Sequence, residues 1–174
     1  MYKENFTMSI REGVQCSAGT KKGKGHQCKK MTYIYSEFCK QHTESLFDLT
    51  LKPSSIPTAG TGLFTMKDIP KNHNIARYTG KVITQEEYDK NPSWYGVAIP
   101  HKRVMDAAST QTGLARYAND CRSANKREGD CKGNNSRFVI ATRAGKTTVW
   151  LRATKNIKAG SEILVPYGRK YWGD

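Results

Sequence analysis

From residue 56 onward, hydrophobic and polar positions fall into short runs that are bordered by glycine, proline or asparagine. The runs are rich in β-branched and aromatic residues, which is typical of strands. They cover residues 73–83, 94–99, 136–143, 147–154 and 161–168. The sequence RAGKT at 143–147 predicts a hairpin turn between two of them. Only residues 36–46 and 85–90 have a helical pattern, so we expect a mainly β domain built of several small sheets.

The first quarter of the chain has a different pattern. Its stretch SAGTKKGKGHQ, residues 17–27, is too polar and too rich in glycine and lysine to fold without a staple. Three cysteines and a histidine have the spacing C-x11-C-x10-C-x2-H, and they are Cys16, Cys28, Cys39 and His42. Zinc prefers four thiolate or imidazole ligands in a tetrahedron, so the spacing predicts a structural zinc site. The alternative is three unrelated thiols with a surface histidine, and His26 is a substitute ligand.

The two patterns are separated by LKPSSIPT at 51–58, whose prolines and serines are typical of a hinge. We therefore divide the chain into three parts. A basic N-terminal module covers residues 1–50, a linker covers 51–57 and the main domain covers 58–174.

Charge and cysteine content narrow the function classes. The 174 residues include 29 basic and 15 acidic ones, a formal net charge of +14. This charge favours an acidic partner such as nucleic acid, although a solvated basic surface would give the same number. No segment approaches the roughly 18 apolar residues of a membrane span, and the N-terminus has no apolar leader, so we expect an intracellular protein without membrane contact. Five cysteines in such a protein indicate thiols or metal ligands rather than a disulfide framework.

A series of motifs follows in order from Ile56 to Trp172. They are AGTGLF, RYTGKVI, MDA with GLARYAND, NNSRF, IKAGSEILVPYG and a terminal YW. In this order the motifs resemble those of the SET-domain family of protein-lysine methyltransferases, over two-thirds of the chain. The resemblance implies several small sheets with a threaded C-terminal segment. It also implies transfer of a methyl group from S-adenosylmethionine to a lysine, expected here on a histone tail in the nucleus, or in the host nucleus if the source is a virus.

Such a transfer requires a narrow, apolar channel. The amine nitrogen and the methyl carbon must be aligned at about 3 Å. The amine must also be neutral, although only about one free lysine in 2,500 is neutral at pH 7. Burial beside a cation lowers the pKa of that amine. Aromatic walls that carry a hydroxyl group suit this task.

The resemblance assigns roles to residues that match the motifs. Tyr167 in PYG corresponds to the catalytic tyrosine, and Tyr78 in RYTG to a second tyrosine of the lysine channel. Phe138 and Val165 correspond to the positions that set the methylation state. The residues expected at the cofactor are Ala59, Gly60, Thr61, Tyr95, Asn119, Asp120, Tyr167 and Trp172.

The sequence departs from the family at Asp120, where the family has a histidine after its asparagine. It also has a longer loop at 121–134, CRSANKREGDCKGN, after which the PN element of the family falls on Asn134 and Asn135. We interpret Cys121 and Cys131 in this loop as two thiols, with metal binding or pairing on oxidation as alternatives.

No cysteine follows Cys131, so the zinc cluster that often completes the family's channel after the SET core cannot form. The chain is therefore similar to compact viral and microbial members. We expect Tyr171 and Trp172, or a second subunit in a homodimer, to complete the site.

Two other function classes remain open. One is a catalytically inactive SET fold that binds a peptide or DNA, which Asp120 favours. The other is a small nucleic-acid-binding protein that acts through its zinc module and its basic loop. The basic residues of that loop, which are candidates for contact with nucleic acid or an acidic peptide, are Arg122, Lys126, Arg127 and Lys132.

Overall fold

The described residues form four small antiparallel sheets. The computed structural model describes residues 14–19, 27–32, 38–108, 113–123, 131 and 133–168. Its strands are β1 (Val14–Gln15), β2 (Met31–Thr32), β3 (Leu49–Pro53), β4 (Thr61–Thr65), β5 (Asn74–Tyr78), β6 (Lys81–Thr84), β7 (Gly96–Ile99), β8 (Arg103–Asp106), β9 (Ser136–Arg143) and β10 (Lys146–Ala153). Its helices are α1 (Lys40–Phe47) and α2 (Gln85–Lys90), with 3-10 turns at Leu114–Tyr117 and Cys121–Ser123. The expected mainly β fold of small sheets is confirmed, and a Cys/His cluster lies near the N-terminus, as expected.

The longest strands form the predicted hairpin. Strands β9 and β10 pair from Ser136 opposite Ala153 to Arg143 opposite Lys146. The turn residues Ala144 and Gly145 have φ values of 47° and 72°, the left-handed backbone that tight hairpins need. Strand β5 pairs with the other edge of β10, giving the order β5-β10-β9. This sheet places Tyr78, at the end of β5, next to Phe138 of β9.

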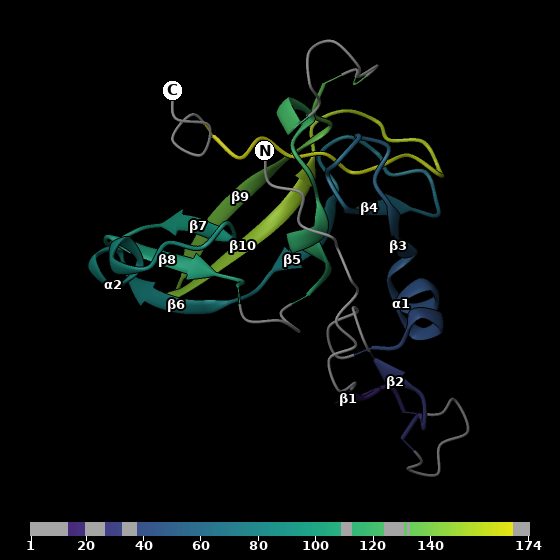
Figure 1. Cartoon of the computed structure of the whole chain (residues 1–174), viewed down its shortest axis with the longest axis horizontal. Coiled ribbons are helices and arrows are strands. Elements are labelled where there is room, and N and C mark those ends of the chain that lie inside the picture. Colours follow the sequence, from purple (N-terminus) through teal and green to yellow (C-terminus); the bar gives the residue numbers. More distant parts are fainter. Residues whose placement is uncertain are drawn as a thin grey trace.

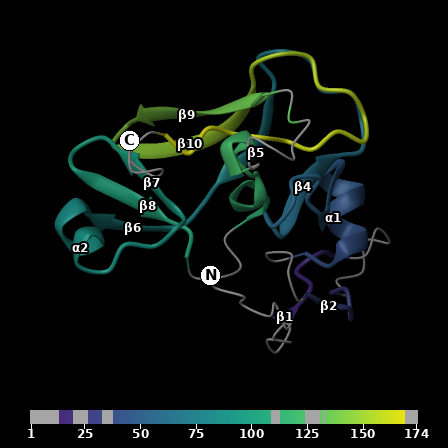
Figure 2. The ribbon, with the colours of Figure 1, turned by 45° about the horizontal axis from the view of Figure 1, so that its top comes forward.

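A second sheet has the order β6-β8-β7. Its middle strand, β8, was not predicted because RVMD is only four residues long and has no clear alternation. The predicted helix at 85–90 is present as α2, and a capping box between Thr84 and Glu87 defines its start. Figure 2 shows this sheet and α2 at one end of the molecule and α1, β1 and β2 at the other.

The segment predicted as a hinge, residues 51–57, is part of the folded unit. Its first three residues belong to β3, which pairs with β4 along its whole length. Leu51 is buried opposite Leu63, so hydrophobic burial and pairing outweigh the proline at the strand end. The residues after β3 form a turn in which Ser54 donates its backbone N–H to the Gly60 carbonyl at 2.8 Å.

Residues 161–168, predicted as a strand, form an extended segment that touches three others. Glu162 bridges to Phe64 of β4, and Leu164 bridges in parallel to Asn119. The Leu164 carbonyl also accepts hydrogen bonds from the backbone N–H groups of Asn135 and Ser136. Because each contact is made to a different segment, the chain is threaded rather than paired in one ladder. Figure 1 shows this segment, in yellow, crossing from the side of β3 and β4 to the side of β7 and β9.

One apolar core joins these parts. Its fully or almost fully buried side chains include Leu49, Leu63, Val149, Leu151, Ile163 and Val165. A separate small cluster in the N-terminal module contains Cys16, Ala18 and Cys39. Among the described residues, no helix is both long and apolar enough to cross a membrane.

Candidate functional site

A cavity of about 140 Å³ lies between β5, β7, β9, the 3-10 turn at 114–117 and the C-terminal segment. A cavity of roughly 150 Å³ holds a molecule the size of benzene, so this one suits a single alkyl side chain. Four residues expected at the site line it, namely Tyr78, Tyr95, Phe138 and Tyr167. The other lining residues are Trp94, Gly96, Val97, Ala98, Ala115, Arg116 and Ala118.

Tyr78 and Phe138 form one aromatic wall. Their rings pack edge to face, with 5.1 Å between the centroids and an angle of 73° between the planes. The Tyr78 hydroxyl donates a hydrogen bond of 2.6 Å to the Tyr95 carbonyl. Burial, opposed in part by the charge of Arg116, raises the pKa of Tyr78 well above its ordinary value. Tyr78 is therefore a neutral phenol over the whole physiological pH range.

Tyr167 is held at both ends. Its hydroxyl lies 3.2 Å from the Ala118 carbonyl and 3.4 Å from Asn119 Oδ1. Its backbone N–H donates to Asp120 Oδ2 at 2.8 Å. The phenol therefore lines the cavity in a fixed position, set by three consecutive residues of another segment.

Two further residues at the cavity were not predicted. The Arg116 guanidinium lies 4.1 Å from the centre of the Tyr95 ring, a cation–π geometry. Its Nε and Nη1 atoms are buried and have no hydrogen-bond partner in the described part of the chain. Trp94, which also lines the cavity, is 74% exposed. The sequence signals were the Arg in GLARYAND and the Trp in WYGVAI, but each fitted a structural role equally well.

The predicted glycine turn lies against Asn119. Asn119 donates its side-chain amide to the Thr61 carbonyl at 3.2 Å. Gly60 has a φ of 72°, and a Cβ at this position would meet no atom within 4 Å. The backbone of this turn is therefore open to close approach by a ligand. Ala59, Gly60, Thr61, Asn119 and Asp120 do not line the aromatic cavity, but contacts through Asn119 connect them to Tyr167.

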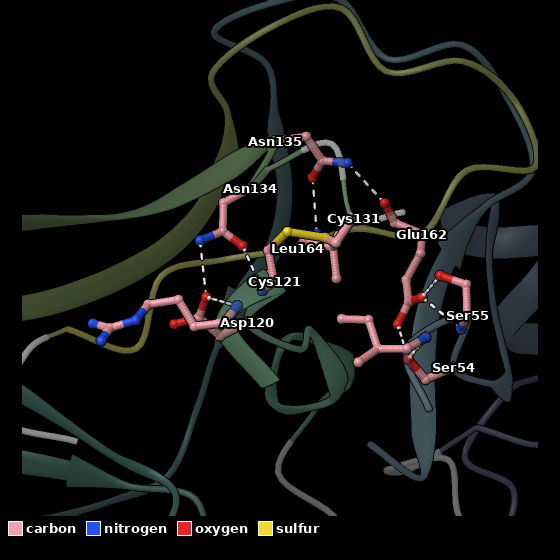
Figure 3. Close-up of a disulfide and its surroundings, with 11 residues drawn as sticks. Ser54, Ser55, Asp120, Cys121, Cys131, Asn134, Asn135, Glu162 and Leu164 are labelled. Carbon is pink, nitrogen blue, oxygen red and sulfur yellow. Dashed lines mark hydrogen bonds between the residues drawn. A yellow bond between two sulfur atoms is a disulfide. The ribbon is translucent and has the colours of Figure 1, made fainter. Parts of the chain in front are cut away.

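Glu162 holds this region together and was also not predicted. Its carboxylate is buried and accepts hydrogen bonds from Ser54 Oγ at 2.7 Å and from the Ser55 backbone N–H at 2.8 Å. Its backbone carbonyl accepts one from Asn135 Nδ2 at 2.7 Å. Figure 3 shows Ser54, Ser55 and Asn135 directed at Glu162 from different segments. In the sequence Glu162 is one acidic residue in a short hydrophobic run, and no local pattern identifies its partners.

Three of the predicted residues are placed elsewhere or not described. Val165, expected in the lysine channel, is fully buried in the core and is not among the residues that line the cavity. Its backbone N–H donates to the Asn119 carbonyl at 2.8 Å, which turns its side chain into the packed interior. Tyr171 and Trp172 lie outside the described residues, as does the alternative ligand His26.

Cys121 and Cys131 form a disulfide, so the prediction of two free thiols in this loop is wrong. The Cα atoms of the two cysteines lie 5.8 Å apart, and their pairing was one of the two alternatives that the sequence left open. Figure 3 shows the disulfide beside Asn134, which follows Cys131 closely in the chain. Of the basic loop residues, Arg122 is described and exposed, whereas Lys126, Arg127 and Lys132 lie outside the described residues.

The four predicted metal ligands come together in the N-terminal module. The sulfur atoms of Cys16, Cys28 and Cys39 and a ring nitrogen of His42 all lie within 4.8 Å of one another. Ligand atoms around a tetrahedral zinc ion are about 3.7 Å apart, so the donor set and its size fit zinc. Cys39 is the N-cap of α1 and His42 lies in its first turn, which presents both side chains to the same point.

Backbone donors favour a thiolate in this cluster. Burial alone would raise the pKa of the Cys16 thiol, but hydrogen bonds from the backbone N–H groups of Cys39 and Ala18 and from His42 lower it to about 7. The pKa of Cys39, by contrast, is raised, mainly by burial. The Cys39 backbone N–H lies 3.2 Å from the Cys16 sulfur.

The fold and the motifs agree with comparisons to known proteins. Residues 60–168 match the SET domain family. The chain is 30% identical over 121 residues to histone-lysine N-methyltransferase SUV39H2 of Xenopus tropicalis, which is 66% of this chain and 29% of that relative.

Solved structures agree as well. The chain matches a crystal structure of an active polycomb repressive complex 2 in the basal state with a TM-score of 0.57 and 25% identity, over 70% of this chain and 15% of that one. It matches apo ctPRC2 in an autoinhibited state with a TM-score of 0.56 and 26% identity, over 69% and 15% of the two chains. The chain thus spans less than a third of the length of each of these proteins. Because the family match covers more than half of its own residues, the chain belongs to the SET domain family.

Proposed function

We propose that the chain is a protein-lysine N-methyltransferase that uses S-adenosylmethionine and acts on a histone tail. The observation that carries this proposal is the aromatic cavity, in which Tyr78, Phe138 and Tyr167 surround a space of one alkyl side chain. Membership of the SET domain family and the similarity to a histone-lysine N-methyltransferase support the activity. The net charge of +14 suits a nuclear protein that works close to nucleic acid.

The cavity would bind the substrate lysine by its methylene groups. Burial of the alkyl chain between aromatic rings excludes water and lowers the pKa of the terminal amine, because an apolar site disfavours the charged form. The hydroxyl protons of Tyr78 and Tyr167 are directed at backbone carbonyls. Each phenol oxygen therefore keeps its acceptor capacity for an N–H of the bound amine. Two fixed acceptors orient the nitrogen lone pair along one direction.

The cofactor would lie against the open glycine turn. Bound S-adenosylmethionine supplies an electrophilic methyl group. Ala59, Gly60 and Thr61 offer accessible backbone groups, and Asn119 connects this turn to Tyr167. Tyr95, the backbone of Asp120 and, outside the described residues, Trp172 are the other proposed cofactor contacts. Tyr171 would complete the substrate channel, whereas Phe138 is the described residue that narrows it.

The N-terminal module would bind one structural zinc ion through Cys16, Cys28, Cys39 and His42. The small cluster around Cys16 and Cys39 is too small to fold alone, which supports a metal as its staple. We assign residues 1–50 to this module.

A transfer assay tests the main proposal. The purified chain is incubated with methyl-labelled S-adenosylmethionine and core histones, and label is measured on lysine. We expect transfer that falls by about 100-fold or more in Tyr167→Phe, since a positioned hydroxyl at the reacting centre is removed. Tyr88→Phe, which changes a tyrosine of α2 outside the cavity, is the matched control and should retain activity.

Two results would contradict the proposal. If calorimetry detects no binding of S-adenosylmethionine by the wild-type chain, the cofactor assignment is wrong. If the cofactor binds but Tyr167→Phe transfers label as well as Tyr88→Phe does, the cavity is not the reaction site. Transfer to a protein other than a histone would retain the activity and replace the substrate.

A further inference from the structure

The side chain of Asp120 is fully buried, with 0% of its surface exposed. A buried carboxylate is costly unless several donors compensate it. Here Oδ1 accepts hydrogen bonds from the Arg122 backbone N–H and from Asn134 Nδ2, both at 3.0 Å. Oδ2 accepts one from the Tyr167 backbone N–H at 2.8 Å. Both oxygens are therefore directed into the protein and joined to separate segments.

Asn134 fixes the orientation of this carboxylate. Its Oδ1 accepts a hydrogen bond of 2.9 Å from the Cys121 backbone N–H, which leaves Nδ2 to donate to Asp120. The amide therefore has one favourable orientation. Figure 3 shows Asn134 between Asp120 and Cys121, next to the disulfide. Asn134, which is fixed by the Cys121 N–H, thus fixes the carboxylate of Asp120 in turn.

The same short segment contacts both ends of Tyr167. The carbonyl of Ala118 and the side chain of Asn119 lie at the Tyr167 hydroxyl, and the carboxylate of Asp120 binds its backbone N–H. Displacement of the backbone at one end therefore moves the hydroxyl at the other. A misplacement of about 1 Å in a reaction that depends on alignment lowers the rate by about 100-fold.

We propose that Asp120 is a positioning residue, whose carboxylate, oriented by Asn134, fixes Tyr167 in the cavity. This inference rests on the proposed methyl transfer. It accounts for an aspartate at a position where the family has histidine, because a carboxylate offers two acceptor atoms to the donors described here, the Arg122 N–H, Asn134 Nδ2 and the Tyr167 N–H. In this proposal the buried side chain of Asp120 does not contact the cofactor.

The most direct test is to swap the side chains of Asp120 and Asn134. Asp120→Asn keeps the shape of the side chain but leaves it with one acceptor oxygen. The NH2 group of the new asparagine must then face another donor, either the Tyr167 N–H or the NH2 group of Asn134. Asn134→Asp alone places two carboxylates in contact. In the double variant D120N/N134D, the new amide can accept from Tyr167 and donate to the new carboxylate, which still accepts from Cys121. Among the described donors to Asp120, the Arg122 N–H is the one that loses its acceptor.

We expect kcat to fall by about 100-fold in Asp120→Asn, with the KM for peptide and the Kd for S-adenosylmethionine changed by less than about threefold. The double variant should recover at least about tenfold of this loss. Unchanged kcat in Asp120→Asn, or a double variant no better than it, overturns the proposal. A weakened Kd for the cofactor with normal kcat at saturation also overturns it, because Asp120 would then be a cofactor ligand.

A second measurement does not require activity. In protein labelled at tyrosine amides, the Tyr167 N–H should be protected from hydrogen exchange in the wild type, exposed in Asp120→Asn and protected again in the double variant. Exchange that is equal in all three overturns the proposal. If this pattern is found but the wild type transfers no methyl group, Asp120 positions Tyr167 in a fold that is not an enzyme; the proposed function and the catalytic part of this inference then both fail. If the double variant D120N/N134D unfolds, the two side chains cannot take each other's place, which also counts against the proposal.

Discussion

The side-chain amide of Asn119 donates a hydrogen bond of 3.2 Å to the carboxylate of Glu162, across 43 residues of sequence. Asn119 also donates to the Thr61 carbonyl. Ser54 and Ser55 donate to the same carboxylate from the turn after β3. Glu162 therefore joins the turn after β3 and the Asn119 segment to the C-terminal segment that contains Tyr167.

We expect Glu162→Ala to destabilise the domain by about 3 kcal/mol or more, because several buried donors lose their acceptor. Glu162→Gln keeps the volume and one oxygen, so it should lose less. Urea unfolding of both variants measures the difference. Equal losses, or a loss below about 1 kcal/mol in Glu162→Ala, would show that water replaces the carboxylate.

Gly62 is the point of closest approach to this carboxylate. A Cβ at Gly62 would lie 2.3 Å from Glu162 Oε1, closer than any real contact. We expect Gly62→Ala to destabilise by about 1–3 kcal/mol, as overpacking usually does. In the double variant with Glu162→Gln the penalties should not add, because both changes disturb one contact. Additive losses in urea unfolding would mean that the two residues act independently.

The disulfide between Cys121 and Cys131 closes a short loop. Its formation should stabilise the domain by about 3 kcal/mol relative to the reduced chain. Unfolding in urea with and without reductant measures this effect. The control is the double variant C121S/C131S, whose stability should not change with reductant. In the denatured, non-reduced protein a thiol assay should find the free cysteines Cys16, Cys28 and Cys39. Detection of all five cysteines as thiols would contradict the pairing.

Local chemistry explains which elements could be predicted from sequence. The RAGKT turn was predictable because Gly145 tolerates a positive φ next to two β-branched runs. The Cys/His cluster was predictable because Cys39 and His42 are three residues apart, which places both side chains on one turn. The resemblance identified Tyr78, Tyr95, Phe138 and Tyr167, and the fold brings them to one cavity. Their chemical roles stay predictions.

Contacts between segments that lie far apart in the sequence could not be predicted in this way. The last three residues of strand β3, Leu51 to Pro53, were interpreted as the start of a hinge, yet the pairing of β3 with β4 is decided by burial of Leu51. The partners of Glu162 come from segments far apart in sequence. The unpartnered Arg116 atoms matter only because the fold places them at a cavity. In each case the decisive neighbour is set by tertiary structure.

Removal of zinc should unfold the N-terminal module and leave the main core folded. The apparent free energy of zinc binding in small modules is about 10–16 kcal/mol, much of it folding energy. We expect one zinc per chain by elemental analysis, lost in Cys28→Ser and retained when Cys121 and Cys131 are both changed to serine. After chelation, proteolysis should cut within residues 14–48 first. A module that resists proteolysis without metal would contradict the zinc assignment.

The buried phenol of Tyr78 makes stability depend on alkaline pH. Because burial raises the pKa of Tyr78 in the folded chain above the value near 10 in the unfolded chain, the unfolded state loses this proton first as pH rises. The contribution of the group is therefore complete below pH 10 and is lost above it, by about 1.4 kcal/mol per pH unit. Tyr78→Phe lacks this titration but also lacks the hydrogen bond to the Tyr95 carbonyl, worth about 1 kcal/mol.

The variant should thus be less stable than the wild type at pH 8, and the deficit should shrink or reverse between pH 10 and 11. Urea unfolding of both proteins at each pH gives the difference directly, and taking the difference removes the titration of the lysines that both share. A deficit that stays constant up to pH 11 would mean that the phenol ionises equally in the folded and unfolded chain. Tyr78 would then be in contact with water, and the cavity would not be the dry channel that a neutral lysine amine requires.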